Sequence, residues 1–287
     1  FFLKRPMVRL FSNIPGWCGF FLVCPWAFAQ TTIDLSKPVS ESLTPDGIYW
    51  TFDQGVVGGS EPEDVEDVSG NGMTGRILPG AVHPKAVYVK GKFGNALGFS
   101  GVTPGIEGSD GILRQSRPNA RVTWRPGKMS GVGDEVKLDL ANGSLTAGIW
   151  VKMDAILSGE AQTVFLMHRG AGVGQWAFLL IKDKADAWKI NVLGAISTDK
   201  TEIFNDGAWH HVAFVREVKD EENIVSFWVD GEQFGSPVVK KNEISPPENG
   251  NDRVFTVGER NAANFSTGFS GALDEAFVTS GAHAFKP

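Results

Sequence analysis

The chain has 287 residues, and its 35 glycines, 20 phenylalanines and 9 tryptophans are typical of an all-β protein, because strands are rich in aromatic residues and turns in glycine. It carries 27 basic and 33 acidic side chains, which give a formal net charge of −6. This acidic balance argues against nucleic acid and anionic membranes as partners, because both attract clusters of Lys and Arg.

Residues 1–29 have the features of a secretory signal peptide. A basic start is followed by an apolar run at residues 19–26 and by Ala27-Phe28-Ala29, which matches the small-x-small pattern of a signal-peptidase site. The apolar run is shorter than the roughly 20 residues that a membrane-spanning helix needs, which argues against the alternative of a retained anchor. We therefore expect an exported protein whose mature chain begins near Gln30.

Removal of this segment would change both the charge and the thiol content of the protein. The segment holds three basic residues and no acidic one, so the net charge would go from −6 to −9. Both cysteines, Cys18 and Cys24, lie within it, so the exported protein would have no disulfide. Animal extracellular domains commonly contain disulfides, so we expect a bacterial protein that is secreted, periplasmic or located at the cell surface.

The mature chain would begin with a polar leader at residues 30–45, after which strand patterns recur. The leader contains two prolines, and we expect it to be draped over the domain or mobile. In residues 145–152 apolar side chains alternate, which places on one strand face Leu145, Ala147, Ile149 and Val151. We expect this face to be buried in the core.

Two hairpins are predicted in the second half of the chain. Residues 175–181 and 187–193 flank one charged turn, and residues 209–216 and 224–229 flank another. Asp230-Gly231 then offers the positive φ that a tight hairpin turn requires. On the core side of the second hairpin we expect Val212, Phe214, Phe227 and Val229.

Several blocks of sequence follow one another in a fixed order along the chain. They are residues 49–53 (YWTFD), 67–72 (DVSGNG), 91–101 (GKFGNALGFSG), 145–152 (LTAGIWVK), 206–215 (DGAWHHVAFV), 227–231 (FWVDG), 256–258 (TVG) and 269–275 (FSGALDE). In this order and at these spacings, the blocks resemble the laminin-G-like jellyroll domains of the concanavalin A-like lectin/glucanase superfamily. The resemblance implies an all-β fold, a two-sheet antiparallel jelly-roll sandwich, as a single domain over residues 46–287.

One segment departs from the pattern of that family. The family runs almost directly from the third block into the next strand, expected here at residues 135–138, whereas this chain has an inserted loop at about residues 102–134. The loop is rich in Gly and Pro and contains Arg121, Trp124 and Arg125. Long loops on rigid β scaffolds often carry function, so these three residues are candidates for holding an anionic or sugar ligand. The alternative is a solvated insertion whose Trp packs back on the sheet.

No catalytic motif is present in the sequence, and we expect the chain not to be an enzyme. Glycosidases of the resembling superfamily set two carboxylates on one strand, about 5 Å apart, and no such run occurs here. The acidic residues 61–67 include a proline and suit a solvated loop. His210-His211 belongs to a framework block, where packing and hydrogen bonding account for it. A divergent polysaccharide-degrading glycosidase or lyase is the alternative.

Metal binding has some support in the sequence. Asp274 is expected to face inward, and a buried carboxylate needs hydrogen bonds, a proton or a cation. In the resembling family the D-x-S-G-N-G loop and the late L-D-E strand lie together, and many relatives hold calcium there. Carried over by position, the ligands of a structural calcium ion would be Asp67, Asn71 and Asp274, with Asp53 as a fourth. A plain Asx turn is the alternative for the loop.

The sequence as a whole predicts a secreted, non-catalytic recognition module. Its ligand would be a carbohydrate, bound in a lectin-like manner, or a glycan or protein of a cell surface to which it adheres. The aromatic candidates for such contacts are Trp124, Trp150 and Trp228, of which the last two lie in framework blocks where core packing is the usual role. We expect neither nucleic-acid binding nor membrane insertion after signal cleavage.

Overall fold

The computed structural model describes residues 31–78, 86–99, 106–107, 113–114, 121–124, 143–154, 162–169, 176–183, 185, 187–192, 195–199, 203–219, 222–241, 254–258 and 270–287. Most of these residues belong to two antiparallel sheets, which we call the nine-stranded sheet and the eight-stranded sheet.

The nine-stranded sheet joins the beginning and the end of the domain. Its strands are β2 (Ile48–Trp50), β5 (Val87–Lys90), β6 (Asn95–Phe99), β10 (Leu145–Met153), β15 (Trp209–Lys219), β16 (Glu222–Val229), β17 (Glu232–Gln233), β18 (Val238–Lys241) and β20 (Gly271–Ser280). Their order is β17-β16-β15-β10-β20-β6-β5, and in addition β18 pairs with β16 and β2 pairs with β20. The late strand β20 therefore lies against both early strands, β2 and β6.

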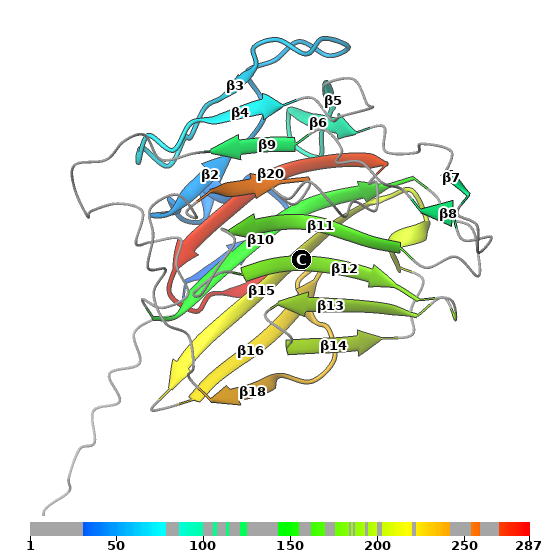
Figure 1. Ribbon diagram of the computed structural model, residues 1–287. Helices are drawn as coiled ribbons and strands as arrows, with labels where there is room; N and C mark the ends of the chain where they lie inside the picture. Colours follow the sequence, from blue (N-terminus) through cyan, green and yellow to red (C-terminus); the bar gives the residue numbers. More distant parts are fainter. Residues whose placement is uncertain are drawn as a thin grey trace, which may run out of the picture.

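The eight-stranded sheet lies over the other one. Its strands are β3 (Asp64–Val65), β4 (Gly75–Leu78), β9 (Arg121–Trp124), β11 (Gln162–Arg169), β12 (Trp176–Lys182), β13 (Trp188–Val192), β14 (Ala195–Asp199) and β19 (Phe255–Val257). Their order is β14-β13-β12-β11-β19-β9-β4-β3. In the view of Figure 1, β11 to β14 lie in front of β10, β15 and β16.

Four short strands and two 3₁₀ turns complete the described structure. Strand β1 (Thr32–Asp34) pairs in parallel with β21 (Ala284–Lys286), and β7 (Ile106–Glu107) pairs with β8 (Leu113–Arg114). The 3₁₀ turns are η1 (Val39–Glu41) and η4 (Ile203–Asn205). Within the described ranges, no helix is long and apolar enough to cross a membrane.

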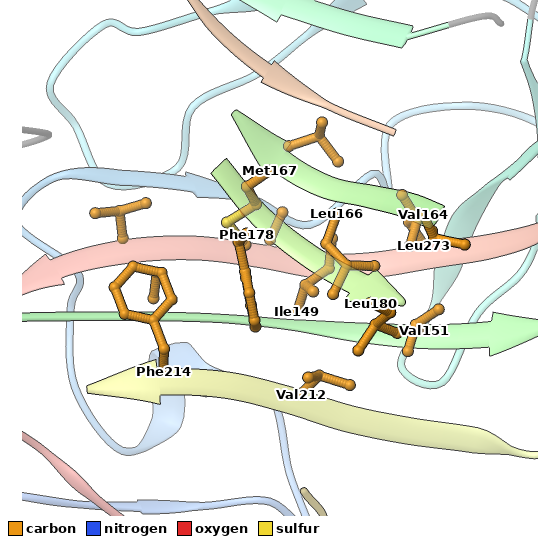
Figure 2. Packing of buried hydrophobic residues seen from close by; sticks show 14 of the residues in the cluster. Ile149, Val151, Val164, Leu166, Met167, Phe178, Leu180, Val212, Phe214 and Leu273 are labelled. Atoms are coloured by element: carbon orange, nitrogen blue, oxygen red, sulfur yellow. The ribbon is translucent and has the colours of Figure 1, made fainter. Parts of the chain in front are cut away.

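The main core lies between the two sheets. Figure 2 shows Phe178 and Leu180 of the eight-stranded sheet facing Ile149 and Phe214 of the nine-stranded sheet. Alternation along each strand sends every second side chain into this layer, as the buried-intermediate pattern of β12 illustrates. Full burial of one such side chain stabilises the fold by about 1.5–3 kcal/mol relative to exposure.

The predicted fold class is confirmed by this architecture. Both predicted hairpins are present, as β12 with β13 and as β15 with β16, and the turn after the second has φ 50° at Asp230 and 86° at Gly231. The side chains expected in the core are all buried, namely Leu145, Ala147, Ile149, Val151, Val212, Phe214, Phe227 and Val229.

Residues 31–45 of the leader lie against the domain. Strand β1 and turn η1 of the leader, together with β21, form a structure that we call the clasp, which covers part of the outer face of the nine-stranded sheet. Ile33 and Val39 of the clasp are buried against sheet side chains such as Tyr49 and Phe277. For this reason β10 is buried on both faces, with the exception of Lys152.

The predicted insertion at residues 102–134 is only in part a loop. It contains β7, β8 and β9, and β9 lies within the eight-stranded sheet between β19 and β4. Val122 of β9 is fully buried in the core. The glycines and prolines of this segment predicted a loop, and a strand of only four residues is too short to show a clear alternation. The strand expected at residues 135–138 lies outside the described residues.

Candidate functional site

The first predicted calcium-binding loop is held by backbone hydrogen bonds to Asp67. Oδ1 of Asp67 accepts from the N–H groups of Tyr49 (3.0 Å) and Ser69 (3.1 Å), and its Oδ2 accepts from the N–H of Met73 (2.9 Å). The bond from Ser69 is the Asx turn that the sequence offered as the alternative. Asp67 thereby fastens the loop to β2.

Asn71 fastens the same loop to the residues before β2. Its Nδ2 donates to the carbonyl oxygens of Asp46 (2.7 Å) and Gly47 (2.8 Å). The side-chain amide thus lies between two main-chain carbonyl oxygens.

Asp274 lies elsewhere, in the middle of β20. It is fully buried, but it lies on the outer face of the sheet opposite Trp150, and the expectation that it faces the core between the sheets is wrong. Its Oδ2 accepts from the N–H groups of Lys92 (2.9 Å) and Phe93 (3.1 Å), and its Oδ1 accepts from the N–H of Glu275 (2.8 Å). Burial raises the pKa of Asp274 to about 8, although these N–H donors favour its ionised form, and the nearby carboxylates of Glu275 and Asp53 add to the increase.

Asp53, the fourth predicted ligand, is exposed and holds the other end of the same turn. Its Oδ1 accepts from the N–H of Asn95 at 2.7 Å. Gly94 in this turn has φ 58°, and a Cβ there would stand 1.9 Å from Oδ1 of Asp53, so only glycine allows the close approach. Asp53 and Asp274 therefore anchor the turn at residues 91–95.

The four predicted ligands thus serve two separate turns. Asp67 and Asn71 hold one turn, Asp53 and Asp274 hold the other, and no hydrogen-bond partner is shared between the two pairs. Within the described part of the chain, no group of three or more His, Cys, Asp or Glu side chains is placed to hold a metal ion. Both carboxylate oxygens of Asp67 and of Asp274 accept N–H groups, and calcium stays a prediction from the resemblance.

The predicted ligand-binding residues of the insertion lie at its strand β9. Arg121 is the first residue of this strand and Trp124 is the last. Arg125 lies outside the described residues.

Glu275 is a buried carboxylate that the sequence did not single out. It is 1% exposed and has φ 51°, an uncommon conformation for a residue with a side chain. Its Oε2 accepts from the N–H of Val39 in the clasp at 3.0 Å and from the hydroxyl of Tyr49. Burial raises the pKa of Glu275. Strand alternation predicts that Glu275 and Asp274 face opposite sides, but the pairing of β20 with β10 is irregular here, and both side chains lie on the outer face.

The His210-His211 pair has the structural roles expected of a framework block. His210 lies 2.7 Å from Asp230 and 3.1 Å from Asp206; burial alone would lower its pKa, but these carboxylates outweigh burial and raise it. His211 points to the opposite face, is fully buried and packs against Trp150. Neither of its ring nitrogens has a hydrogen-bond partner among the described residues, and burial lowers its pKa to about 3.

Beside the clasp, part of the outer face of the nine-stranded sheet remains accessible. We call this area the outer patch, and it consists of Lys92, Phe93, Trp150, Lys152 and Trp209. The ring of Phe93 meets that of Trp150 edge to face at 6.0 Å, and Trp209 packs against the same cluster. Phe93 and Trp209 are half-buried, whereas both lysines are exposed.

The sequence predicted only one member of the outer patch, Trp150, and that residue is buried beneath the others. The alternation of Trp150 with Lys152 was a signal that these two side chains share a face. The proximity of Lys92 and Phe93 depends on the turn that Asp274 holds, which no local pattern shows.

A family model matches more than half of the sequence. The model described as the Concanavalin A-like lectin/glucanases superfamily, of the laminin-G type, matches residues 130–283, which is more than half of the chain. No curated protein sequence matches the chain significantly.

Solved structures of similar shape have distant sequences. Trypanosoma rangeli sialidase in complex with sialic acid has a TM-score of 0.46 and 16% identity, over 81% of this chain and 30% of the sialidase. The binding domain of botulinum neurotoxin serotype D has a TM-score of 0.43 and 9% identity, over 83% and 48%. Endo-1,3-β-glucanase from Streptomyces sioyaensis has a TM-score of 0.36 and 11% identity, over 65% and 76%. At these scores the likeness carries no information on ligand or activity.

Proposed function

The chain belongs to the Concanavalin A-like lectin/glucanases superfamily, and from this premise we propose that it is a secreted, non-catalytic domain that recognises carbohydrate. The proposed export rests on the basic start, the apolar run and the Ala27-Phe28-Ala29 pattern of the sequence.

The outer patch is the observation that carries the proposal. A sugar ring has one face of C–H groups and a rim of hydroxyls, so it is recognised by an apolar ring that lies beside polar groups. Trp209 and Phe93 offer such rings, and Lys92 and Lys152 offer ammonium donors next to them. Half-buried aromatic side chains lose little conformational entropy on binding, which is why Trp is enriched at contact surfaces.

A glycan array, followed by calorimetry on the glycans that bind, tests this proposal. Trp209→Ala is expected to weaken binding about tenfold or more, because a central aromatic contact is lost. Ile196→Ala is the matched control, since Ile196 is an exposed apolar residue of β14 in the other sheet. Absence of binding to any glycan, or equal loss in both variants, would contradict the proposal.

The same glycans decide between recognition and the alternative of a polysaccharide-degrading enzyme. Incubation of bound glycans with the protein, followed by a reducing-end assay for hydrolysis and an absorbance assay for unsaturated lyase products, is expected to give no signal above the buffer blank. Formation of product would contradict the proposed recognition function and favour a polysaccharide-degrading enzyme.

Calcium is proposed only as a structural ion of the domain. Melting curves in calcium and in chelator test it, because a ligand at a hundredfold excess over its dissociation constant stabilises the folded state by about 2.7 kcal/mol. A lower melting temperature in chelator, largely absent in Asp67→Asn, would establish the ion. Superimposable curves would leave the two turns held by the described N–H donors alone.

A further inference from the structure

Two lysines of the outer patch stand on one face of the nine-stranded sheet. Lys152 is the one exposed residue of β10, and its side chain lies on the same face as Trp150, two residues before it. Across the strands its partners are Trp209 of β15 and Ala272 of β20. Lys92 reaches the same place from the turn before β6, where its Nζ lies 4.4 Å from the centroid of the Trp150 ring.

Neither lysine is neutralised by a carboxylate of the described chain. Some lysines have ion-pair partners, such as Lys286 with Asp34 (3.0 Å) and Lys189 with Asp183 (3.0 Å), whereas the exposed Lys219 and Lys240 have none among the described residues. Lys92 and Lys152 form no ion pair with any described residue, although acidic side chains outnumber basic ones in this protein. The two unpaired ammonium groups therefore form a local positive region on an acidic molecule.

Two carboxyl groups beside the outer patch accept hydrogen bonds from neighbouring residues. Asp154 follows Lys152 on the same face and accepts a hydrogen bond from the hydroxyl of Ser270. Asp274 lies opposite Trp150 on β20, where it accepts the N–H groups of Lys92 and Phe93.

We propose that the outer patch binds an anionic saccharide, whose ring stacks on Trp209 or Phe93 while its carboxylate or sulfate group contacts Lys92 and Lys152. This rests on the proposed function and names its ligand class. Ammonium groups attract such anions as point charges, and aromatic rings beside them bind the C–H face of the sugar. A neutral saccharide would leave both lysines without a counterion in the complex.

Affinity electrophoresis tests the proposal with alginate, polygalacturonate and a sulfated galactan as anionic probes, and with neutral galactan and methyl-esterified polygalacturonate as uncharged ones. The double variant Lys92→Gln, Lys152→Gln is compared with Lys219→Gln, Lys240→Gln, which removes the same charge from exposed positions of β15 and β18. Melting curves of both variants establish that they are folded.

The expected result is retardation by at least one anionic probe, weakened about tenfold in the first double variant and unchanged in the second. Retardation is also expected to decrease as NaCl rises, because the contacts are electrostatic and exposed. A comparison of the carboxylated with the sulfated probes shows which anionic group the outer patch binds. Binding to uncharged probes only would overturn this inference and leave carbohydrate recognition intact, whereas binding to no saccharide would overturn both.

Discussion

At the scale of single residues, two adjacent carboxyl groups are buried at the centre of β20. Neighbouring residues of a strand normally face opposite sides, so one member of such a pair is usually exposed. Here the pairing of β20 with β10 is irregular and Glu275 has φ 51°, so Asp274 and Glu275 both lie on the outer face, where the turn at residues 91–95 covers one and the clasp covers the other. Their burial makes the stability of the domain sensitive to pH.

For Asp274→Asn we expect a weaker pH dependence of stability between pH 5 and pH 8. The folded-state pKa of Asp274, about 8, lies above the unfolded value of 3.8, so the folded state retains a proton that the unfolded state has lost. The free energy of unfolding therefore decreases as pH rises through this window, by at most about 1.4 kcal/mol per pH unit for this group. Urea unfolding at pH 5, 6.5 and 8 measures the slope, with Glu217→Gln as an exposed control. A slope equal to that of the wild type would contradict the assignment.

For His211→Leu we expect greater resistance to acid. The folded-state pKa of His211, about 3, lies below the unfolded value of 6.5, so between these values the unfolded state takes up a proton that the buried ring cannot. Stability is lost as pH falls through that window, by at most about 1.4 kcal/mol per pH unit. Leu removes the titration, and no hydrogen bond is sacrificed because neither ring nitrogen has a described partner. Unfolding at pH 6.5 and pH 4 checks this; an unchanged difference between the two would refute it.

At the scale of elements, the clasp converts the outer face of the nine-stranded sheet into a second core. Phe285 of β21 packs on His211 and Trp228, and Leu35 donates its N–H to the carbonyl of Lys286 at 2.9 Å. The ion pair of Asp34 with Lys286 adds little, because it is exposed to solvent. Apolar burial therefore accounts for most of the clasp's stability.

Ile33→Ala is expected to destabilise the domain by about 2–5 kcal/mol, because it removes a fully buried side chain from the second core. Chemical denaturation provides the measurement. Ile196→Ala, at an exposed position of β14, should change stability by less than about 0.5 kcal/mol. Equal effects of the two substitutions would mean that the clasp does not hold the sheet.

The elements differ in how far the sequence could predict them. The hairpins β12–β13 and β15–β16 follow from alternation and from turn residues, which act between neighbours in the chain. The insertion of β9 between β19 and β4 depends on pairing across the whole domain, and a strand of four residues has too short a pattern to show it. The clasp is missed for the same reason, since the leader has no long apolar face of its own.

At the scale of the whole molecule, the fold was predictable and the site only in part. The order of the blocks predicts the sandwich because each block marks a strand end or a tight turn. The predicted ligands Asp67 and Asp274 are both buried, but the structure assigns them to different turns, and Asp274 lies on the outer face of its sheet. Outer-patch residues such as Lys92 and Trp209 come from distant segments that meet only in the folded sheet.

Export is the prediction that belongs to the chain as a whole. Mass spectrometry of the protein produced with its own leader in a bacterial host is expected to give an N-terminus within a residue or two of Gln30, because signal peptidase cleaves after the small-x-small pattern. A chain that retains residues 1–29 after export would show that this segment is not a cleaved signal. The buried residues of the leader follow the predicted cleavage site after Ala29, so cleavage there would leave the clasp intact.

The parallel pairing of β1 with β21 also determines how the domain would respond to mechanical force. Thr32 lies beside Ala284 and Asp34 beside Lys286, so the chain enters one strand at the end opposite to that by which it leaves the other. A pull on the two ends would slide the strands along each other, and all hydrogen bonds of the pair would bear the load together. In a hairpin pulled open from its ends, these bonds would break one at a time. A domain that holds a surface ligand under flow would therefore have its strongest mechanical element where the tension enters.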